Sequence, residues 1–380
     1  MKRLFLGGES FVIGCGSLAY LEKIKANKAF IVTGSQSMIK NGIIGKIEKM
    51  LQQNHCETLV YAGVSKNPDT GCVLDGVKKM QEFMPDLVIA IGGGSPMDAA
   101  KVMTIFYEYP ELTFEHAVKQ GVPNQRTKVK LIAIPTTSGT ASEVTRAAVV
   151  TFKDKNIKIG LKSDAFIPDV AIVDAELTVT MPDHIVAETG MDAMTHAVEA
   201  YCNDNLDDFT EVMARGAVQG LYTHLPISYR EKTVAAREKV HHYQSLAGFA
   251  FTNVGLGMVH GIAHAIGGQY DEAHGLINAV ALPYVLEYNR QHNPKVAEKL
   301  VVLAKAIDVE DFVQAIRALN HQLHIPASFQ AMGISQADFQ RDFDLIVQNS
   351  LQGSTKSNPV KMNQADMEIL LKKIYDGIQC

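Results

Sequence analysis

Two pairs of polar residues in the second half of the chain have the types and the spacing of metal ligands. Asp192 and His196 are four residues apart, and His260 and His264 repeat that spacing. Residues four apart share one face of a helix, and a further histidine, His274, follows ten residues later. Imidazole suits iron(II) and zinc, and one carboxylate offsets the charge of a divalent ion. The spacing predicts a site for one ion, but it leaves open which of His260, His264 and His274 bind.

A competing interpretation applies to each of these histidines taken alone. A single histidine on an apolar helix face is more often a hydrogen-bonded core residue than a ligand. Two pairs in segments rich in Ala, Gly and Met leave both interpretations open. The other histidines of the chain lack such partners, and we expect them to be surface, helix or core residues.

Two loops in the first half of the chain are suited to hold a nucleotide. The first, residues 92–101, reads GGGSPMDAAK and follows an apolar run. Its glycines let the backbone approach a ligand closely, Ser95 is a candidate N-cap, and the free amides of the following helix form an anion site. The second, residues 135–143, reads PTTSGTASE and offers hydroxyl groups after another apolar run. Each loop alone is also typical of an ordinary tight turn, but together they favour a nucleotide site at the ends of two strands.

Two kinds of architecture are needed to position these residues. Short apolar runs alternate with helical patterns through the first half, which predicts a parallel, doubly wound, Rossmann-like α/β sheet. After Pro182 the strand signals stop and long helical patterns follow. We therefore expect an α/β domain over residues 1–182 and an all-helical domain over residues 183–380. The expected strands cover residues 29–33, 58–61, 86–91 and 130–134, and the clearest helices cover residues 231–251, 294–307 and 364–378, the last behind Asn363 as N-cap.

The composition of the chain argues against some classes of partner and favours one cellular compartment. A net charge of −5 gives no basic face for a phosphate backbone, so nucleic acid is not expected as a partner. No run of about 20 apolar residues occurs, so no membrane association is expected. The short apolar run after Arg3 does not resemble a signal peptide. The five cysteines are scattered and form no CxxC pair, which favours a reducing, cytoplasmic setting.

Long segments of the chain match one known family. The matching segments are GGGSPMDAAK at 92–101, PTTSGTASEVT at 135–145, PDVAIVDAEL at 168–177, GMDAMTHAVEAY at 190–201, GFAFTNVGLGMVHGIAHAIGG at 248–268 and GLINAVALPYVLEYN at 275–289. With these segments the chain resembles the iron-containing (group III) alcohol dehydrogenases along nearly its whole length. The resemblance implies their architecture, which dehydroquinate-synthase-like enzymes share. It also implies a homodimer or higher homo-oligomer, and hydride transfer between a small primary alcohol or diol and a nicotinamide cofactor.

The resemblance implies a role for each of the five metal-site candidates. Asp192, His196, His260 and His274 match the residues that bind the metal in the family. His264 matches the histidine that lies beside the nicotinamide and transfers a proton. Three imidazoles and one carboxylate accept iron(II) or zinc, and we expect Fe(2+), with zinc as the possible substitute.

The resemblance also assigns the cofactor contacts. The GGGS segment matches the pyrophosphate site, the PTTSGT segment matches a second cofactor loop, and two later positions match residues that touch the cofactor. The implied cofactor residues are Gly93, Gly94, Ser95 and Asp98 in the first loop, Thr136, Thr137, Thr140 and Ser142 in the second, and Lys158 and Leu177 beyond them.

Two departures from the family pattern concern the cofactor and the C-terminus. Members that prefer NAD(H) carry an Asp after the first strand, where this chain has Gly34 followed by Ser35, with Ser37 nearby. An Asp there bonds the ribose 2′-hydroxyl and repels a 2′-phosphate. Because Gly34 removes this repulsion, we expect NADP(H) to be favoured over NAD(H). The family's Cys-x-x-x-Asn-Pro-Arg-like turn is replaced by GSTKSNPV at residues 353–360, to which we assign no chemistry.

Rival functions remain on the same scaffold. A related glycerol-dehydrogenase-like polyol dehydrogenase would use zinc, and a dehydroquinate-synthase-like lyase needs basic residues that the metal-site segments lack. A non-catalytic nucleotide-binding protein is disfavoured because all five candidate site residues are present. The substrate cannot be read from the sequence, since the candidate pocket residues fit the core equally well. These candidates are Phe249, Phe251, Thr145, Ala148 and Leu256.

Overall fold

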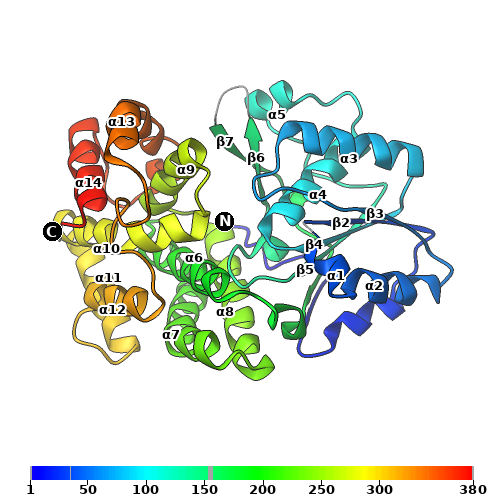
Figure 1. Ribbon diagram of the computed structural model, residues 1–380, viewed down its shortest axis with the longest axis horizontal. Helices are drawn as coiled ribbons and strands as arrows, with labels where there is room; N and C mark the ends of the chain where they lie inside the picture. The colour runs from blue at the N-terminus through cyan, green and yellow to red at the C-terminus, as the bar shows by residue number, and fades with distance from the viewer. Residues whose placement is uncertain (1, 35, 153–156, 379–380) are drawn as a thin grey trace. The chain divides into compact units, whose positions relative to one another are not determined.

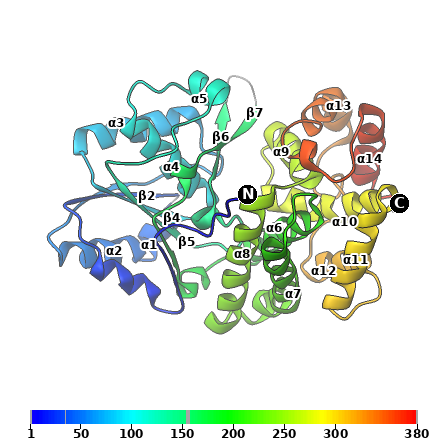
Figure 2. The ribbon, with the colours of Figure 1, turned by 180° about the vertical axis from the view of Figure 1, so that it is seen from behind.

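The chain folds into two compact units, Met1–Thr180 and Met181–Cys380. The structure is a computed structural model that describes residues 2–34, 36–152 and 157–378. Figures 1 and 2 show its elements from opposite sides, with strands confined to the first unit and helices alone in the second. The predicted change from α/β to all-α is therefore confirmed.

The first unit is built on a six-stranded parallel sheet in the order β1-β8-β5-β4-β2-β3 (Figure 1). All six positions of β4 are buried, as are five of the six in β2 and in β5. Such continuous apolar strands form where helices cover both faces of a parallel sheet. The strands are β1 (Ser10–Ile13), β2 (Lys28–Thr33), β3 (Glu57–Tyr61), β4 (Leu87–Gly92), β5 (Lys130–Pro135) and β8 (Val170–Val173).

A separate apolar core lies on each face of this sheet. One core joins the sheet to α3 (Thr70–Phe83), to α4 (Gly94–Glu108) and to an antiparallel hairpin of β6 (Ala147–Phe152) and β7 (Ile157–Lys162). The other joins it to η1 (Ser17–Lys23), α1 (Ser37–Lys40) and α2 (Ile43–Gln52). Figure 1 shows these two helical layers above and below the strands. The remaining elements of the unit are α5 (Phe114–Gln120) and the short turns η2 (Ser142–Val144), η4 (Asp164–Phe166) and η5 (Ala175–Thr178).

The second unit surrounds α6, a helix that is buried along most of its length. Small residues allow its neighbours to come close. A Cβ on Gly190 of α6 would lie 2.2 Å from Leu225, and a Cβ on Gly275 would lie 2.3 Å from the carbonyl oxygen of Glu188. The helices are α6 (Asp183–Cys202), α7 (Asp208–Glu231), α8 (Val234–Val254), α9 (Met258–Tyr270), α10 (His274–His292), α11 (Pro294–Ala306), α12 (Phe312–Gln322), α13 (Gln336–Ser350), η6 (Gly353–Ser357) and α14 (Gln364–Asp376).

The observed helix ends refine the predicted ones. The helix expected from residue 231 begins only at Val234, because Lys232 takes a left-handed φ of 56° and Thr233 caps the next helix. The N-cap predicted for the last helix is confirmed, since the Asn363 side chain accepts a hydrogen bond from the Asp366 amide at 2.9 Å.

No single helix in the described ranges is long and apolar enough to cross a membrane. The pair α8 and α9 meets the same criterion of length and composition only when taken together, across a bend of 102°.

Candidate metal centre and cofactor loops

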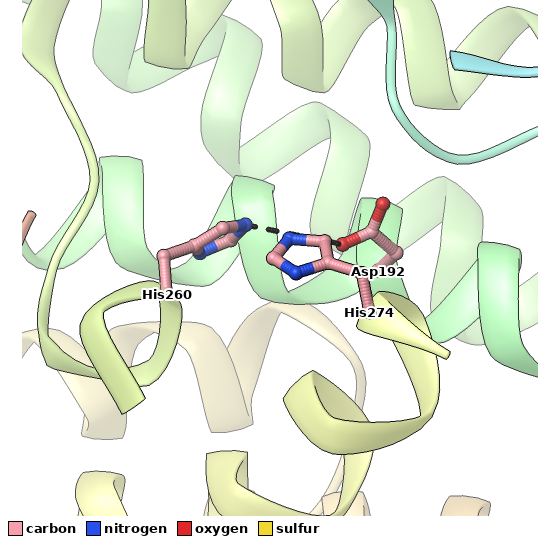
Figure 3. Close-up of side chains that lie close together, drawn as sticks. All are labelled: Asp192, His260 and His274. Carbon is pink, nitrogen blue, oxygen red and sulfur yellow. Dashed lines mark ion pairs between the residues drawn. The ribbon is translucent and has the colours of Figure 1, made fainter. Parts of the chain in front are cut away.

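Three helices of the second unit bring Asp192, His260 and His274 together. Asp192 lies in the middle of α6, His260 in the first turn of α9, and His274 is the first residue of α10. One ligand atom from each lies within 4.8 Å of the other two, and Figure 3 shows the three side chains converging. Asp192 Oδ1 lies 3.9 Å from Nε2 of His260 and 3.9 Å from Nε2 of His274.

His196 borders this group from α6. Its Nε2 lies 4.0 Å from Asp192 Oδ1, and its ring stacks on His260 at 4.5 Å and on Phe251 at 4.3 Å. Its Nδ1 is buried and has no hydrogen-bond partner among the described residues. Phe251, a residue that sequence alone could place in a pocket or in the core, thus packs directly against a metal-site candidate.

These distances fit a single ion. Two ligand atoms that bind one ion at about 2.0–2.2 Å can be at most about 4.4 Å apart. The three histidine nitrogens lie 3.9–4.0 Å from Asp192 Oδ1, inside that limit. Three imidazoles with one carboxylate are a donor set that iron(II) accepts. The residues present therefore fit the ion expected from the sequence.

His264 lies one helical turn beyond His260 on α9 and is only partly buried. Its ring stacks on that of His274 at 5.1 Å and lies 6.3 Å from that of His260. Like His196, it stands outside the three residues whose ligand atoms converge, but His196 has a nitrogen 4.0 Å from Asp192 Oδ1. This position beside Asp192, His260 and His274 is compatible with a residue that exchanges a proton with a ligand bound there.

Asn278 and Glu199 touch the group, and neither was predicted from the sequence as a site residue. The Asn278 amide donates to Asp192 Oδ1 at 2.7 Å and lies 3.3 Å from His260 Nε2 and 3.2 Å from His274 Nε2. Glu199 Oε2 lies 2.6 Å from His260 Nδ1. Spacing offers a signal for both, because Asn278 is one turn after His274 and Glu199 is two turns after Asp192.

Burial dominates the electrostatics of this group. It raises the pKa of Asp192 against the opposing effects of His196 and of the Asn278 hydrogen bond. Burial likewise raises the pKa of Glu199 to about 7. It lowers the pKa of His260 well below its ordinary value, and the neighbouring His196 and His264 act in the same direction. A neutral imidazole is the form that binds a metal, so the protein environment favours the ligating form of His260.

The two loops of the first unit lie against each other at the carboxyl ends of β4 and β5. The Thr136 amide donates to the Gly92 carbonyl at 2.8 Å. A Cβ on Gly93 would lie 3.3 Å from Thr137 Oγ1, and one on Gly94 would lie 2.8 Å from Thr140 Cγ2. Glycine at these positions is therefore what lets the loops pack side by side.

Ser95 does not cap α4, contrary to the prediction. The helix begins at Gly94, and Gly93 in an extended conformation takes the N-cap position. Ser95 thus lies within the first turn, where its hydroxyl donates to the Lys66 carbonyl. The run of glycines moved the helix start because the backbone can enter the helix without a side-chain cap.

Asp98 and Ser142, both predicted to contact the cofactor, bond to each other. Ser142 Oγ donates to Asp98 Oδ1 at 2.7 Å, and the Val149 amide donates to Asp98 Oδ2 at 2.9 Å. Both carboxylate oxygens of Asp98 therefore have protein partners, and burial raises the pKa of this group. The pair ties α4 to the second loop.

The other predicted cofactor residues fall on three different elements. Gly34 follows β2, and a Cβ there would make only ordinary contacts, 3.7 Å to the Val64 carbonyl and 3.9 Å to Pro96 Cγ. Lys158 lies on β7 opposite Thr151. Leu177 belongs to the core on the α2 face of the sheet. Ser35, named for the 2′-phosphate, lies outside the described residues.

Comparison with known proteins decides the family. A family described as iron-containing alcohol dehydrogenase matches residues 9–175, and the C-terminal domain of the Fe-containing alcohol dehydrogenase family matches residues 186–375. The chain belongs to the iron-containing alcohol dehydrogenases. It is a metal-dependent alcohol dehydrogenase, an oxidoreductase that uses a nicotinamide cofactor. The matches do not favour the zinc-dependent polyol dehydrogenase that we kept as an alternative.

Relatives along the full length support this alcohol dehydrogenase assignment. The chain is 39% identical to the NADPH-dependent butanol dehydrogenase of Clostridium saccharobutylicum, over 96% of both chains. It is 34% identical to the 1-propanol dehydrogenase PduQ of Salmonella typhimurium, over 95% of this chain and 96% of that one. The iron-containing alcohol dehydrogenase of Thermococcus thioreducens superposes with a TM-score of 0.92 at 30% identity, over 98% of this chain and all of that one. A 1,3-propanediol oxidoreductase superposes with a TM-score of 0.90 at 30% identity, over 99% of this chain and all of that one.

Proposed function

We propose that this alcohol dehydrogenase interconverts small primary alcohols or diols and their aldehydes with NADP(H). We propose that one Fe(2+) is held by Asp192, His196, His260 and His274. The observation that carries the metal assignment is the set of three histidine nitrogens 3.9–4.0 Å from Asp192 Oδ1. Relatives named for butanol, 1-propanol and 1,3-propanediol support the substrate class.

The protein's own residues prepare this site for the reaction. When bound, the ion supplies a Lewis acid for an alcohol oxygen and the nicotinamide supplies a hydride acceptor. Asn278 holds the Asp192 carboxylate through a 2.7 Å hydrogen bond. His264, partly exposed beside His274, carries the alcohol proton away toward solvent, which is general-base work suited to an imidazole. Aldehyde reduction uses the same groups in reverse.

The preference for NADP(H) rests on Gly34. A carboxylate at this position would repel a 2′-phosphate, and a Cβ on Gly34 would make only ordinary contacts, the nearest at 3.7 Å to the Val64 carbonyl. The chain therefore lacks the repulsive group, although the backbone at Gly34 leaves room for a Cβ. The NADPH-dependent butanol dehydrogenase, at 39% identity, supports the same preference.

The cofactor proposal is tested by Gly34→Asp, with Gly45→Asp as control because Gly45 lies on α2 in open space. Gly34→Asp should lower kcat/KM for NADPH at least tenfold, about 1.4 kcal/mol, and should spare NADH. Gly45→Asp should leave both values unchanged. An equal loss for both cofactors would contradict the proposal.

The metal and substrate proposals are tested on one set of samples. Iron-loaded and zinc-loaded proteins are assayed with primary alcohols, diols and aldehydes, using NADH and NADPH. We expect the iron-loaded protein with NADPH to be the most active on short primary substrates. Asp192→Ala should contain no stoichiometric metal and show no turnover. A metal-free Asp192→Ala protein with full activity would exclude the assignment.

We further propose a cytoplasmic homodimer or higher homo-oligomer that binds neither nucleic acid nor membranes. None of the four described cysteines forms a disulfide, which supports a reducing compartment. The oligomer rests on the family resemblance. Sedimentation velocity should give at least twice the mass of one chain, and a species of single-chain mass at micromolar concentration would contradict it.

A further inference from the structure

Glu199 connects the two helices that carry most of the metal-site residues. It lies on α6, two turns after Asp192, and its side chain reaches α9. Oε2 lies 2.6 Å from His260 Nδ1, and Oε1 accepts the Val259 amide at 2.7 Å. Glu199 and His260 are both buried. One carboxylate therefore engages both the imidazole of His260 and the backbone of the helix that carries it.

We propose that Glu199 is a positioning residue, which fixes the ring and the tautomer of His260 so that Nε2 faces Asp192. In its ionised form the Glu199 carboxylate only accepts hydrogen bonds, so Nδ1 of His260 then carries the hydrogen and Nε2 is free of it. Carboxylates that hold a ligating histidine in this way raise its basicity and fix its orientation. The inference rests on the proposed metal site, because it explains how one of its ligands is prepared.

The N-terminus of α9 has a second acceptor, which is independent of His260. Asn358 Oδ1 accepts the Met258 amide at 3.3 Å, and its amide is held by Asn289 Oδ1 and the Val360 carbonyl, both at 2.9 Å. Gly257 allows both acceptors to approach, since a Cβ there would lie 2.9 Å from Glu199 Oε1 and 3.0 Å from Asn358 Oδ1. The C-terminal turn at residues 353–360, for which the sequence predicted no chemistry, thus supports the metal-site helix.

Asn358 provides the matched control for Glu199. Both side chains accept an amide from the first turn of α9, but only Glu199 bonds the imidazole of His260. If Glu199 acted only by holding the helix, loss of either acceptor would have the same effect on metal binding. If it orients His260, only the loss of Glu199 weakens binding strongly.

Glu199→Gln is the informative variant because it preserves volume. Val259 and His260 face different terminal atoms of Glu199, and a glutamine has an acceptor oxygen at only one of these two positions and an NH₂ donor at the other. If the oxygen faces Val259, the amide nitrogen donates to Nδ1 and places the imidazole hydrogen on Nε2. If the oxygen faces His260, two N–H groups oppose each other at the helix end. Either arrangement disturbs the function that we assign to Glu199.

The experiment measures Co²⁺ affinity of metal-free protein by competition with a chelator, together with the visible Co²⁺ spectrum and thermal unfolding. The samples are the full-length wild type, Glu199→Gln, Asn358→Ala and Asp192→Ala. We expect Glu199→Gln to bind Co²⁺ about 10–100-fold more weakly, with an altered spectrum. Asn358→Ala should unfold at a lower temperature but keep its Co²⁺ affinity within about threefold of the wild type, a margin well below the loss expected for an outer-shell carboxylate.

Wild-type affinity in Glu199→Gln, or an equal loss in Asn358→Ala, would overturn the inference and leave the metal site intact. Undiminished Co²⁺ binding by Asp192→Ala would instead overturn the proposed site and the inference with it. A measurement on the wild-type protein also tests the proposal, even if Glu199→Gln does not fold. In the NMR spectrum of ¹⁵N-histidine-labelled, metal-free protein, recorded at a pH at which Glu199 is ionised, His260 should carry its hydrogen on Nδ1, and a hydrogen on Nε2 would overturn the proposal.

Discussion

His264 and the four proposed ligands lie within one small region, yet their contacts divide them. Asp192, His260 and His274 direct ligand atoms toward one another, and His196 adds Nε2 at 4.0 Å from Asp192. His264 instead stacks on the ring of His274 and is partly exposed. At the scale of single residues, metal binding and proton transfer should therefore be separable by mutation.

The His264→Ala variant should still bind the metal but should have a lower kcat. General acid–base catalysis contributes about 10²–10⁴-fold, so kcat should fall within that range while the ion-to-protein ratio stays at that of the wild type. His116→Ala, on the short helix α5, serves as the control with unchanged kcat. Steady-state kinetics and metal analysis on the same preparations check both quantities. Loss of the metal from His264→Ala would place this residue among the ligands.

Lys101 is a buried cation that the proposed chemistry does not use. Its ammonium donates to the Thr145 and Ala147 carbonyls at 3.0 and 2.9 Å, which fixes the chain between the second loop and β6. Burial lowers its pKa to about 8, although Asp98 and Glu143 act in the opposite direction. In the unfolded chain the group returns to its ordinary pKa of 10.5.

The depressed pKa of Lys101 predicts a specific pH dependence of stability. Between about pH 8 and 10.5 the unfolded chain binds one more proton at Lys101 than the folded protein, so the free energy of unfolding rises with pH. The slope from this group is at most about 1.4 kcal/mol per pH unit. Denaturant titrations of the wild type and Lys101→Met at pH 7, 8 and 9 measure this effect. The free energy of unfolding of the wild type should rise relative to that of Lys101→Met above pH 8. Parallel curves for the two proteins would contradict the assignment.

The types and spacing of Asp192 and His196 and of His260 and His264 suggested a metal site, because helical periodicity places residues four apart on one face. The choice of ligands came from the family resemblance. Glu199 and Asn278 also lie at helical spacing from Asp192 and His274, but that spacing alone does not distinguish them from other polar residues of the same helices. Their roles depend on contacts between α6, α9 and α10, and such contacts have no signature within one helix. Residue identity predicts candidate ligands, whereas the groups that orient them appear only in the packed structure.

At the scale of elements, the cofactor loops depend on glycines that permit close packing. Gly94→Ala would place a Cβ 2.8 Å from Thr140 Cγ2 and push the two loops apart. Overpacking of this kind costs about 1–3 kcal/mol, so we expect the Kd for NADPH to rise about tenfold. Gly160→Ala, where a Cβ meets nothing within 4 Å, is the control. Binding measured by NADPH fluorescence should separate the two, and equal affinities would contradict the role of these loops.

Strong local patterns predicted elements well, and short or interrupted ones did not. The wholly buried strand β4 and the strand β5 were predicted within one residue at each end. The four-residue strands β1 and β8 and the antiparallel pair β6–β7 were missed, because four residues carry little periodicity and the residues between β6 and β7 include no Asn-Gly or Asp-Gly hairpin signal. The break between α7 and α8 was also missed, since Lys232 has no intrinsic preference for the left-handed φ of 56° that it adopts.

At the scale of the whole molecule, each unit has cores of its own, and the metal-site residues all belong to the second. Metal binding should therefore stabilise that unit selectively. An ion present at 100 times its Kd raises the free energy of unfolding by about 2.7 kcal/mol. Hydrogen exchange of the most protected amides should then be about 100-fold slower. Hydrogen-exchange mass spectrometry with and without Fe(2+) should show this protection in α6, α9 and the start of α10. Protection confined to residues 1–180 would contradict the site.

The most direct test of the metal assignment is anomalous X-ray scattering from crystals of the iron-loaded protein, recorded on both sides of the iron absorption edge. The proposed site predicts one iron peak per chain, about 2 Å from an Asp192 oxygen and from one nitrogen each of His196, His260 and His274. His264 should lie outside bonding distance of that peak. An iron peak elsewhere in the chain, or one that His264 coordinates in place of His196, would contradict it.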